Sequence, residues 1–473
     1  MLDQLKQDFA SLGHDFARPV KATPLAGSEV RHINWALVEQ LGLRDWIKTP
    51  AKLQLIASAN CQGLAMKYSG HQFGVFNPQL GDGRGLLLGE WQDPEGELWD
   101  WHLKGAGQTP FSRFGDGRAV WRSSLREHFI GESLSALGIS STRSLCLASS
   151  QDTVMREAPE QAATVIRVAK SHIRFGSFEE FFYQRKYPQL QELADYCLHR
   201  YLPNAAAGDY QALLDMAVTN TARMIALWQS FGFNHGVMNT DNMSIIGETF
   251  DFGPYAFLDD YDPQFICNHS DHHGRYSFEQ QPNIGLWNLN ALAHALSILM
   301  DQGQLKESLM AYQKQLANHY QESLNRRLGL NSVQEADVAL AQHWLQLLRE
   351  HKLDYNLSFR ALASWLRDGQ WPGQFDVLRS NNTAEQWLSS YQERIRQQCP
   401  SETAQKMDSY NPLYLPRTHH LQAVIEASQN GNDGPMEKLF QCIQQPFKRH
   451  KDDLGFDRSP QEADKGLCLS CSS

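Results

Sequence analysis

The stretch NHGVMNTDNMSIIGETFDFGPYAFLDD, residues 234–260, decides how the rest of the chain is interpreted. It contains an Asp-Phe-Gly triplet that begins at Asp251, and an asparagine lies upstream at Asn242. A side-chain amide from a loop and a carboxylate from the turn that follows are hard oxygen ligands of the kind Mg²⁺ takes, and they leave room for phosphate oxygens. Either residue alone fits an ordinary turn, but together they predict a metal site that handles a phosphorylated ligand.

The spacing of these residues is typical of the catalytic segment of protein kinases. In that segment a general-base Asp precedes the metal-binding Asn by five positions, and Asp-Phe-Gly follows. Here the fifth position before Asn242 is Val237, which cannot accept a proton, and Asp241 lies directly before the asparagine. The residues alone leave open whether Asp241 is the general base or orients Asn242. The segment predicts kinase-like chemistry with a displaced base.

Composition narrows the class of protein. The chain has 473 residues, of which 42% are hydrophobic and 20% charged, which fits a globular protein of two or three domains. A net charge of −10 argues against a non-specific nucleic-acid surface. The first residues have no apolar signal segment, no apolar run is long enough to span a bilayer, and the eight cysteines are scattered. We therefore expect a cytoplasmic protein without a membrane or nucleic-acid partner.

Strand patterns dominate the early part of the chain and helix patterns the late part. The segment LWDWHLK, residues 98–104, alternates with a period of two, so Trp99, Trp101 and Leu103 share one face. Long helical patterns follow residue 176. This order predicts an α+β, protein-kinase-like bilobed fold with a small mixed strand and helix N-lobe and a large helical C-lobe. The expected parts are residues 1–175, 176–455 with the catalytic loop 234–260, and a flexible tail 456–473.

Two glycine-rich loops are candidates for contact with a nucleotide. The sequence GDGRG supplies Gly81, Gly83 and Arg84 before a strand, where backbone without side chains can approach phosphates. The sequence FGDGRAV supplies Asp116 and Gly117. Taken alone, each loop fits a plain turn better than a nucleotide site.

Four charged residues complete the candidate site. Lys104 ends a strand and Glu127 lies on the next predicted helix, an order in which a glutamate can orient a lysine against phosphates. Arg167 interrupts an apolar strand, where an unpaired charge costs on the order of several kcal/mol, and Arg174 follows it. A polyphosphate or a structural carboxylate would both supply the missing partner, so the residues alone leave the two interpretations open.

Three cysteines are candidates for redox chemistry. Cys468 and Cys471 form a CxxC pair near the end of the chain, and Cys267 follows the Asp-Phe-Gly triplet. A thiol pair in a terminal tail can exchange disulfides with a reachable partner thiol. A redox tether between Cys471 and Cys267 and free tail thiols are equally compatible with the sequence.

Four segments together resemble the selenoprotein O family, also called the YdiU family. They are YSGHQFGVFNPQLGDGRG, LKGAGQTPFSRFGDGRAV, SSLREHFIGE and HGVMNTDNMSIIGETFDFGPYAFLDDYDP. The resemblance implies a protein-kinase-like fold and a protein adenylyltransferase that moves AMP from ATP to Ser, Thr or Tyr hydroxyls of proteins. It also implies Mg²⁺ or Mn²⁺ as cofactor and a related transfer of UMP from UTP.

The resemblance also assigns roles to residues. It implies that Asp241 accepts the proton, that Asn242 and Asp251 bind the metal, and that Glu127 pairs with Lys104. The nucleotide-binding residues that it implies are Gly81, Gly83, Arg84, Lys104, Asp116, Gly117, Arg167, Arg174 and Asp251. Family members bind ATP inverted relative to ordinary kinases, so a base at position 237 is not needed. Many eukaryotic members carry selenocysteine at the position of Cys471, and a cysteine there weakens or alters a redox role.

Two other functions remain as alternatives. A kinase that transfers the γ-phosphate would use Asp241 as an unusual base, and Val237 argues against it. A pseudokinase that only binds nucleotide and regulates partners would not need both metal ligands. The presence of Lys104, Glu127, Asn242 and Asp251 argues against this second alternative.

Overall fold

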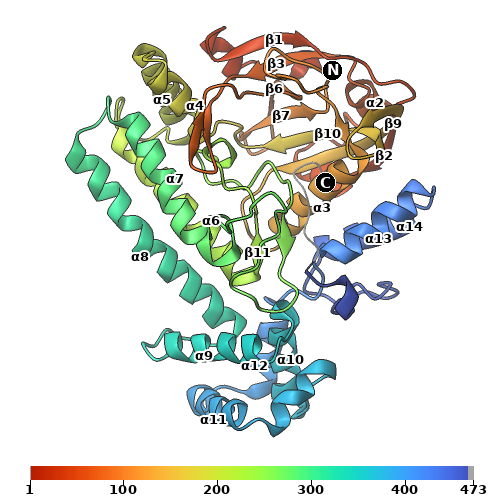
Figure 1. The fold of residues 1–473 in the computed structure, drawn as a ribbon, viewed down its shortest axis with the longest axis vertical. Coiled ribbons are helices and arrows are strands. Elements are labelled where there is room, and N and C mark those ends of the chain that lie inside the picture. The colour runs from red at the N-terminus through yellow and green to blue at the C-terminus, as the bar shows by residue number, and fades with distance from the viewer. Residues whose placement is uncertain (1, 467–473) are drawn as a thin grey trace.

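An eight-stranded antiparallel sheet forms the core of the first lobe in the computed structural model, which describes residues 2–466 (Figure 1). The strand order is β1-β3-β6-β7-β10-β9-β2, and β8 pairs with β10. The strands are β1 (Ala17–Lys21), β2 (Glu29–Ile33), β3 (Gln62–Met66), β6 (Gly85–Gln92), β7 (Leu98–Lys104), β8 (Ala119–Val120), β9 (Arg143–Met155) and β10 (Pro159–Ala169). Helix α3 (Trp121–Ala136) packs against β9 and β10.

Strand β7 confirms the alternation that its sequence predicts. Trp101 and Leu103 are fully buried in a core that also contains residues of α1 (Trp35–Gln40) and α2 (Ala51–Ala57). The opposite face carries Asp100, His102 and Lys104, and these side chains are buried as well. A polar strand face that is covered by protein must find partners inside the molecule, because buried charges are costly when unpaired.

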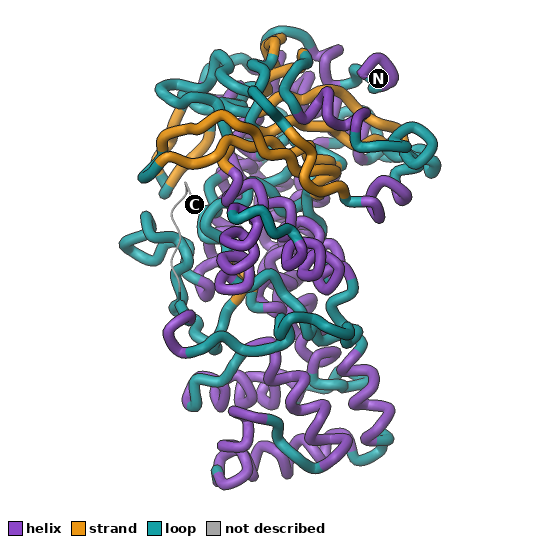
Figure 2. The backbone as a smooth tube through the Cα atoms, turned by 90° about the vertical axis from the view of Figure 1, so that its right-hand side faces the viewer, coloured by secondary structure: helices purple, strands orange, loops and turns teal. Residues whose placement is uncertain are grey.

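The second lobe is helical, and Figure 2 shows strands gathered at one end of the molecule and helices filling the other. Its long helices α6 (Tyr210–Phe231) and α8 (Gln302–Arg327) pack against each other. The remaining helices are α4 (Phe175–Tyr183), α5 (Tyr187–Tyr201), α7 (Gln281–Leu296), α9 (Asp337–Glu350), α10 (Tyr355–Asp368), α11 (Asn382–Ile395) and α12 (Pro400–Asp408). The α+β, kinase-like bilobed arrangement is thereby confirmed. None of the helices within residues 2–466 is long and apolar enough to cross a membrane.

Two short hairpins frame the catalytic segment. Strand β11 (Phe233–Asn234) pairs with β12 (Ala256–Phe257), so the loop between them starts and ends at the same place. Strands β4 (Gly70–Gln72) and β5 (Val75–Asn77) form a separate hairpin. This second hairpin contacts the 3₁₀ turn Thr240–Asn242 within the catalytic loop.

The last two helices return to the first lobe. Helices α13 (Thr418–Gln429) and α14 (Gly434–Gln444) contact α3 and lie apart from α9–α12 (Figure 1). Arg31 on β2 pairs with Asp433 at 2.6 Å, and the ring of Phe440 stacks on that of His128 with centroids 4.8 Å apart. The predicted boundaries at residues 175 and 455 stay a prediction, but part of the range 176–455 packs against the sheet lobe.

Candidate active site

A cavity of about 820 Å³ lies between the catalytic loop and the glycine-rich loops of the sheet lobe. Ten of the predicted site residues line it: Gly81, Gly83, Arg84, Lys104, Asp116, Gly117, Arg167, Asp241, Asn242 and Asp251. Glu127 and Arg174 are buried and contact residues of the lining. The structure therefore brings together residues from six separate segments of the chain that the sequence singled out one by one.

Lys104, Arg167 and Arg174 are joined to one another through two carboxylates. Glu127 on α3 accepts a hydrogen bond from Lys104 Nζ and another from Arg167 Nε. Asp251 Oδ1 lies 2.9 Å from Arg167 Nη2, and Asp251 Oδ2 accepts from Arg174 Nη1 at 2.6 Å. Three cations thus share two carboxylates, and a surplus of positive charge borders the cavity.

Burial and charge shift the pKa values of this cluster in opposite directions. Burial lowers the pKa of Lys104 to about 8, although Glu127 opposes the shift. Burial alone would raise the pKa of Glu127, but Arg167 and Lys104 outweigh it and lower the value to about 2. Burial is likewise outweighed at Asp251, where Arg174 and Arg167 hold the pKa well below its usual range. Both carboxylates are ionised at neutral pH, and an anion such as a polyphosphate would be attracted to the remaining charge.

The two glycine-rich loops pack so closely that side chains would not fit. A Cβ atom on Gly81 would lie 2.5 Å from the ring of Phe111, and Gly81 has a φ of +125°. A Cβ on Gly117 would lie 2.1 Å from the backbone of Gly107. Thr109 Oγ1 donates to the carbonyl oxygen of Asp82 at 2.6 Å and ties one loop to the other. Packing between the loops therefore requires glycine at these positions, and both loops line the cavity.

Asp116 lines the cavity and pairs with a further cation at its rim. Its carboxylate accepts from Arg156 Nη1 at 2.7 Å and from the backbone of Arg118 at 2.9 Å. Arg156 also lines the cavity. Asp116 therefore holds a further cation at the rim, and Arg156 is a residue that the sequence analysis missed because it lies in an unremarkable hairpin turn.

Asp241 is held in the wall of the cavity with one oxygen unpartnered. Gln72 Nε2 donates to Asp241 Oδ2 at 3.2 Å, whereas Asp241 Oδ1 is buried and finds no hydrogen-bond partner among residues 2–466. Burial raises the pKa of Asp241 to about 7, and Arg174 opposes that shift. Arg174 Nη1 also donates to the carbonyl oxygen of Asp241 at 2.8 Å, which fixes the backbone at this point.

The oxygens around this point fit a hard divalent cation. Asn242 Nδ2 donates to the carbonyl oxygen of Val237 at 2.9 Å, which leaves the side-chain oxygen of Asn242 available. Asp251 Oδ2 accepts one hydrogen bond from Arg174, and Oδ1 forms an ion pair with Arg167, so both oxygens retain a free lone pair. No group of three or more His, Cys, Asp or Glu residues within the described range could hold a metal alone. A cation here would take its other ligands from phosphates and water, as Mg²⁺ commonly does.

Two lining residues beside the glycine loop were also missed by sequence reasoning. Asp82 Oδ2 accepts from the backbone of Met66 at 3.1 Å and pairs with His102 Nε2 at 3.1 Å. These contacts fix the position of the loop that contains Gly81 and Gly83. His102 could have been predicted from the period of two in β7, which places it on the same face as Lys104.

Cys267 is buried below the catalytic loop. Its Sγ lies 3.6 Å from the carbonyl oxygen of Asn234, and a Cβ on Gly236 would lie 2.5 Å from the sulfur. Cys468 and Cys471 lie outside the described residues. The tether between Cys471 and Cys267 therefore stays a prediction.

Comparison with known proteins agrees with this geometry. The family described as Protein adenylyltransferase SelO matches residues 2–444. The chain is 44% identical to the protein nucleotidyltransferase YdiU of Vibrio cholerae, over 99% of this chain and 98% of that protein. It is 47% identical to the protein of the same name from Chromohalobacter salexigens, over 87% and 83% of the two chains. For the Aeromonas hydrophila protein of that name the identity is 46%, over 91% of each chain. The chain belongs to the protein adenylyltransferase SelO family.

Proposed function

We propose that this member of a nucleotidyltransferase family transfers AMP from ATP to Ser, Thr or Tyr hydroxyls of other proteins. The observation that carries the proposal is the position of the ionisable groups in the cavity. Lys104 and Arg167 lie together at Glu127, whereas Asp241 lies beside the predicted metal ligands. Val237 occupies the position of the kinase base and also lines the cavity. This arrangement supports chemistry at a phosphate other than the one held by the cations.

In this proposal ATP binds with its γ-phosphate at Lys104 and Arg167. The acceptor hydroxyl attacks the α-phosphorus, a new phosphorus–oxygen bond forms, and the bond from the α-phosphorus to the bridging oxygen breaks. Pyrophosphate leaves, and the proton of the acceptor hydroxyl passes to Asp241. Since proton transfer by a positioned group contributes about 10²- to 10⁴-fold, the carboxylate must lie within hydrogen-bond reach of the hydroxyl.

Asn242 and Asp251 would hold the Mg²⁺ or Mn²⁺ ion. Once bound, such an ion neutralises phosphate charge and orients the reacting group. The protein contributes the rest: Arg167 and Arg174 fix the Asp251 carboxylate, and Val237 fixes the Asn242 amide through its backbone carbonyl. Nucleotide contacts would come from Arg84, from Asp116 and from the backbone at Gly81, Gly83 and Gly117.

Several finer expectations belong to the same proposal. UTP would replace ATP in a related UMP transfer, with Mn²⁺ in place of Mg²⁺. The protein substrates, a cytoplasmic location and a redox tether through Cys267 and Cys471 are likewise proposed, and the scattered cysteines support the location.

Two labelling reactions test the proposal. The purified protein is incubated with a generic protein acceptor, Mg²⁺ or Mn²⁺, and ATP labelled at either the α- or the γ-phosphate. Label transferred from the α-position alone is expected, and Asp241→Asn is expected to abolish it while nucleotide binding persists. Label from the γ-position alone would establish the kinase alternative. Bound nucleotide with no transfer from either position would establish the pseudokinase alternative.

A further inference from the structure

The β4–β5 hairpin lies directly against the catalytic loop and is fixed there on both sides of Gln72. The backbone N–H of His71 donates to Thr240 Oγ1 at 2.7 Å. The backbone N–H of Phe73 donates to the hydroxyl of Tyr276 at 2.9 Å. Phe73 has a φ of +51°, a conformation that costs a non-glycine residue about 1 kcal/mol or more and that the surrounding contacts must hold. The hairpin therefore holds the residue between these contacts in one place.

The side chain of Gln72 joins Asp241 to the far strand of the hairpin. Its Nε2 donates to Asp241 Oδ2 at 3.2 Å, and its Oε1 accepts from Asn77 Nδ2 at 3.3 Å. Because Asn77 donates to the amide oxygen, the amide of Gln72 presents its NH₂ group to the carboxylate. Asn77 Oδ1 in turn accepts from the backbone of Gln79 at 2.9 Å, which fixes the orientation of the asparagine amide as well.

We infer that Gln72 is a positioning residue for Asp241, an inference that rests on the proposed role of Asp241 as proton acceptor. The bond to Oδ2 holds the carboxylate in one rotamer in the wall of the cavity. A hydrogen bond from an amide to a carboxylate is stronger than a neutral one. Gln72 lines the same cavity as Asp241, whereas Asn77 is not among the cavity-lining residues. The two hydrogen bonds from Asn77 to Gln72 and from Gln72 to Asp241 thus fix the orientation of the Asp241 carboxylate relative to the hairpin.

Substitutions at Gln72 test the first link. Gln72→Met keeps the length and volume of the side chain but cannot donate. The kcat for AMP transfer is expected to fall roughly 10- to 100-fold, the range of one hydrogen bond to a charged group, with KM for ATP within about twofold. Gln72→Glu has the same shape but places a carboxylate against Asp241, so a larger loss is expected. A kcat of the parent protein in Gln72→Met would overturn the inference.

Substitution at Asn77 separates positioning from packing. Asn77→Asp retains the oxygen that accepts from Gln79, so the turn is preserved. Its second oxygen accepts from the NH₂ group of Gln72 and turns the amide oxygen toward Asp241. The kcat of Asn77→Asp is expected to fall about as far as that of Gln72→Met. In Asn77→Ala nothing selects either orientation of the Gln72 amide, so a smaller fall in kcat is expected. Equal activity of Asn77→Asp and Asn77→Ala would overturn the inference, provided that both melt at the temperature of the parent.

A structural readout keeps this test apart from the proposed function. Crystal structures of the parent and of Gln72→Met with ATP and Mg²⁺ show the Asp241 rotamer directly. Rotation of the carboxylate in Gln72→Met is expected, and an unchanged carboxylate would overturn the positioning role whatever the activity. If the unsubstituted protein transfers no label from the α-phosphate, the proposed function fails, and the rotamer comparison still decides the role of Gln72.

Discussion

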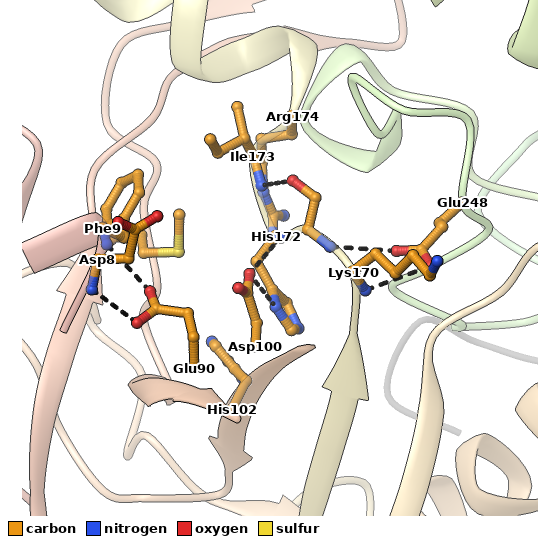
Figure 3. Close-up of polar contacts among 12 residues, drawn as sticks. Asp8, Phe9, Glu90, Asp100, His102, Lys170, His172, Ile173, Arg174 and Glu248 are labelled. Carbon is orange, nitrogen blue, oxygen red and sulfur yellow. Dashed lines mark hydrogen bonds and ion pairs between the residues drawn. The ribbon is translucent and has the colours of Figure 1, made fainter. Parts of the chain in front are cut away.

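Two buried charge clusters contain residues of strand β7. They differ in whether the positive and negative charges balance within the protein. At the end of the strand, Lys104 belongs to the cluster of three cations and two carboxylates that borders the cavity. At its beginning, Asp100 accepts from Arg200 on α5 at 2.6 Å and from the backbone of His172 at 2.9 Å. Figure 3 shows the contact between Asp100 and His172, with His102 beside them.

The Asp100 cluster is matched within the protein. Burial lowers the pKa of His172 to about 4, so its ring is neutral at pH 7 and adds no charge. Burial would raise the pKa of Asp100, but Arg200 outweighs it and lowers the value. Nearby, Glu90 accepts from the backbones of Asp8 and Phe9 at 2.8 and 3.0 Å (Figure 3). Burial of charge alone therefore does not mark the candidate site, which differs from the Asp100 cluster in its surplus of positive charge.

The largest effect is expected from removing Asp251. Asp251→Ala deletes a predicted metal ligand and leaves Arg167 and Arg174 without their shared carboxylate. Metal-dependent AMP transfer is expected to fall by about 10³-fold or more, because several kcal/mol of positioning and charge stabilisation are lost. Incorporation of label from the α-phosphate measures the effect, and circular dichroism checks the fold. Full activity in the folded variant would remove Asp251 from the metal role.

A smaller loss is expected from Glu127→Gln. The amide has nearly the same shape but cannot neutralise Lys104 and Arg167, so both cations lose their fixed geometry. We expect kcat/KM for ATP to fall by about 10- to 100-fold. Glu132→Gln is the matched control, because that glutamate lies on the same helix and pairs with Arg143 at 2.7 Å. Equal losses in the two variants would show that Glu127 acts only through the stability of α3.

The Asp100 cluster is expected to affect stability rather than catalysis. Arg200→Met leaves Asp100 buried without its cation, which lowers the free energy of unfolding by about 3–5 kcal/mol. Denaturant unfolding measures this loss, and activity per folded molecule should stay within about twofold of the parent. Arg396→Met serves as control, because its pair with Glu393 is exposed and contributes about 1 kcal/mol at most. A loss of kcat in Arg200→Met without a loss of stability would show that the Asp100 cluster contributes to catalysis.

The last expected effect is a change in the pH dependence of stability at Glu248. Burial raises the pKa of this carboxyl from 4.5 to about 8, although the backbone N–H groups of Lys170 and Ser171 oppose the shift (Figure 3). An acid with a raised pKa in the folded state destabilises the fold as pH rises from its unfolded value to its folded value. Glu248→Gln removes this term.

The melting temperature of Glu248→Gln is expected to exceed that of the parent by several degrees at pH 8.5 and to match it at about pH 4.5. Asp215→Asn, at a solvated position of α6 for comparison, should leave the pH profile of the parent unchanged. If the melting temperatures of the parent and of Glu248→Gln change with pH in the same way, Glu248 is ionised in the folded protein at neutral pH.

Local pattern predicted most of the candidate site and the broad fold. The alternation in β7, the glycine-rich loops and the spacing of Asn242 and Asp251 each lie within one short segment, where residue type and position suffice. Gln72 and Arg156 could not be predicted this way. The bond from Gln72 to Asp241 joins residues 169 positions apart, and no local periodicity indicates such a contact.

The sequence by itself determined which chemical groups are present: a carboxylate at Asp241, predicted metal ligands beside it, and cations earlier in the chain. Only the tertiary structure decided which charges are matched. It pairs Arg174 with Asp251 and Arg200 with Asp100. It also brings α14 back onto α3. The physical reason is that the partner of a buried charge is chosen by long-range packing, which must satisfy each charge that it removes from water.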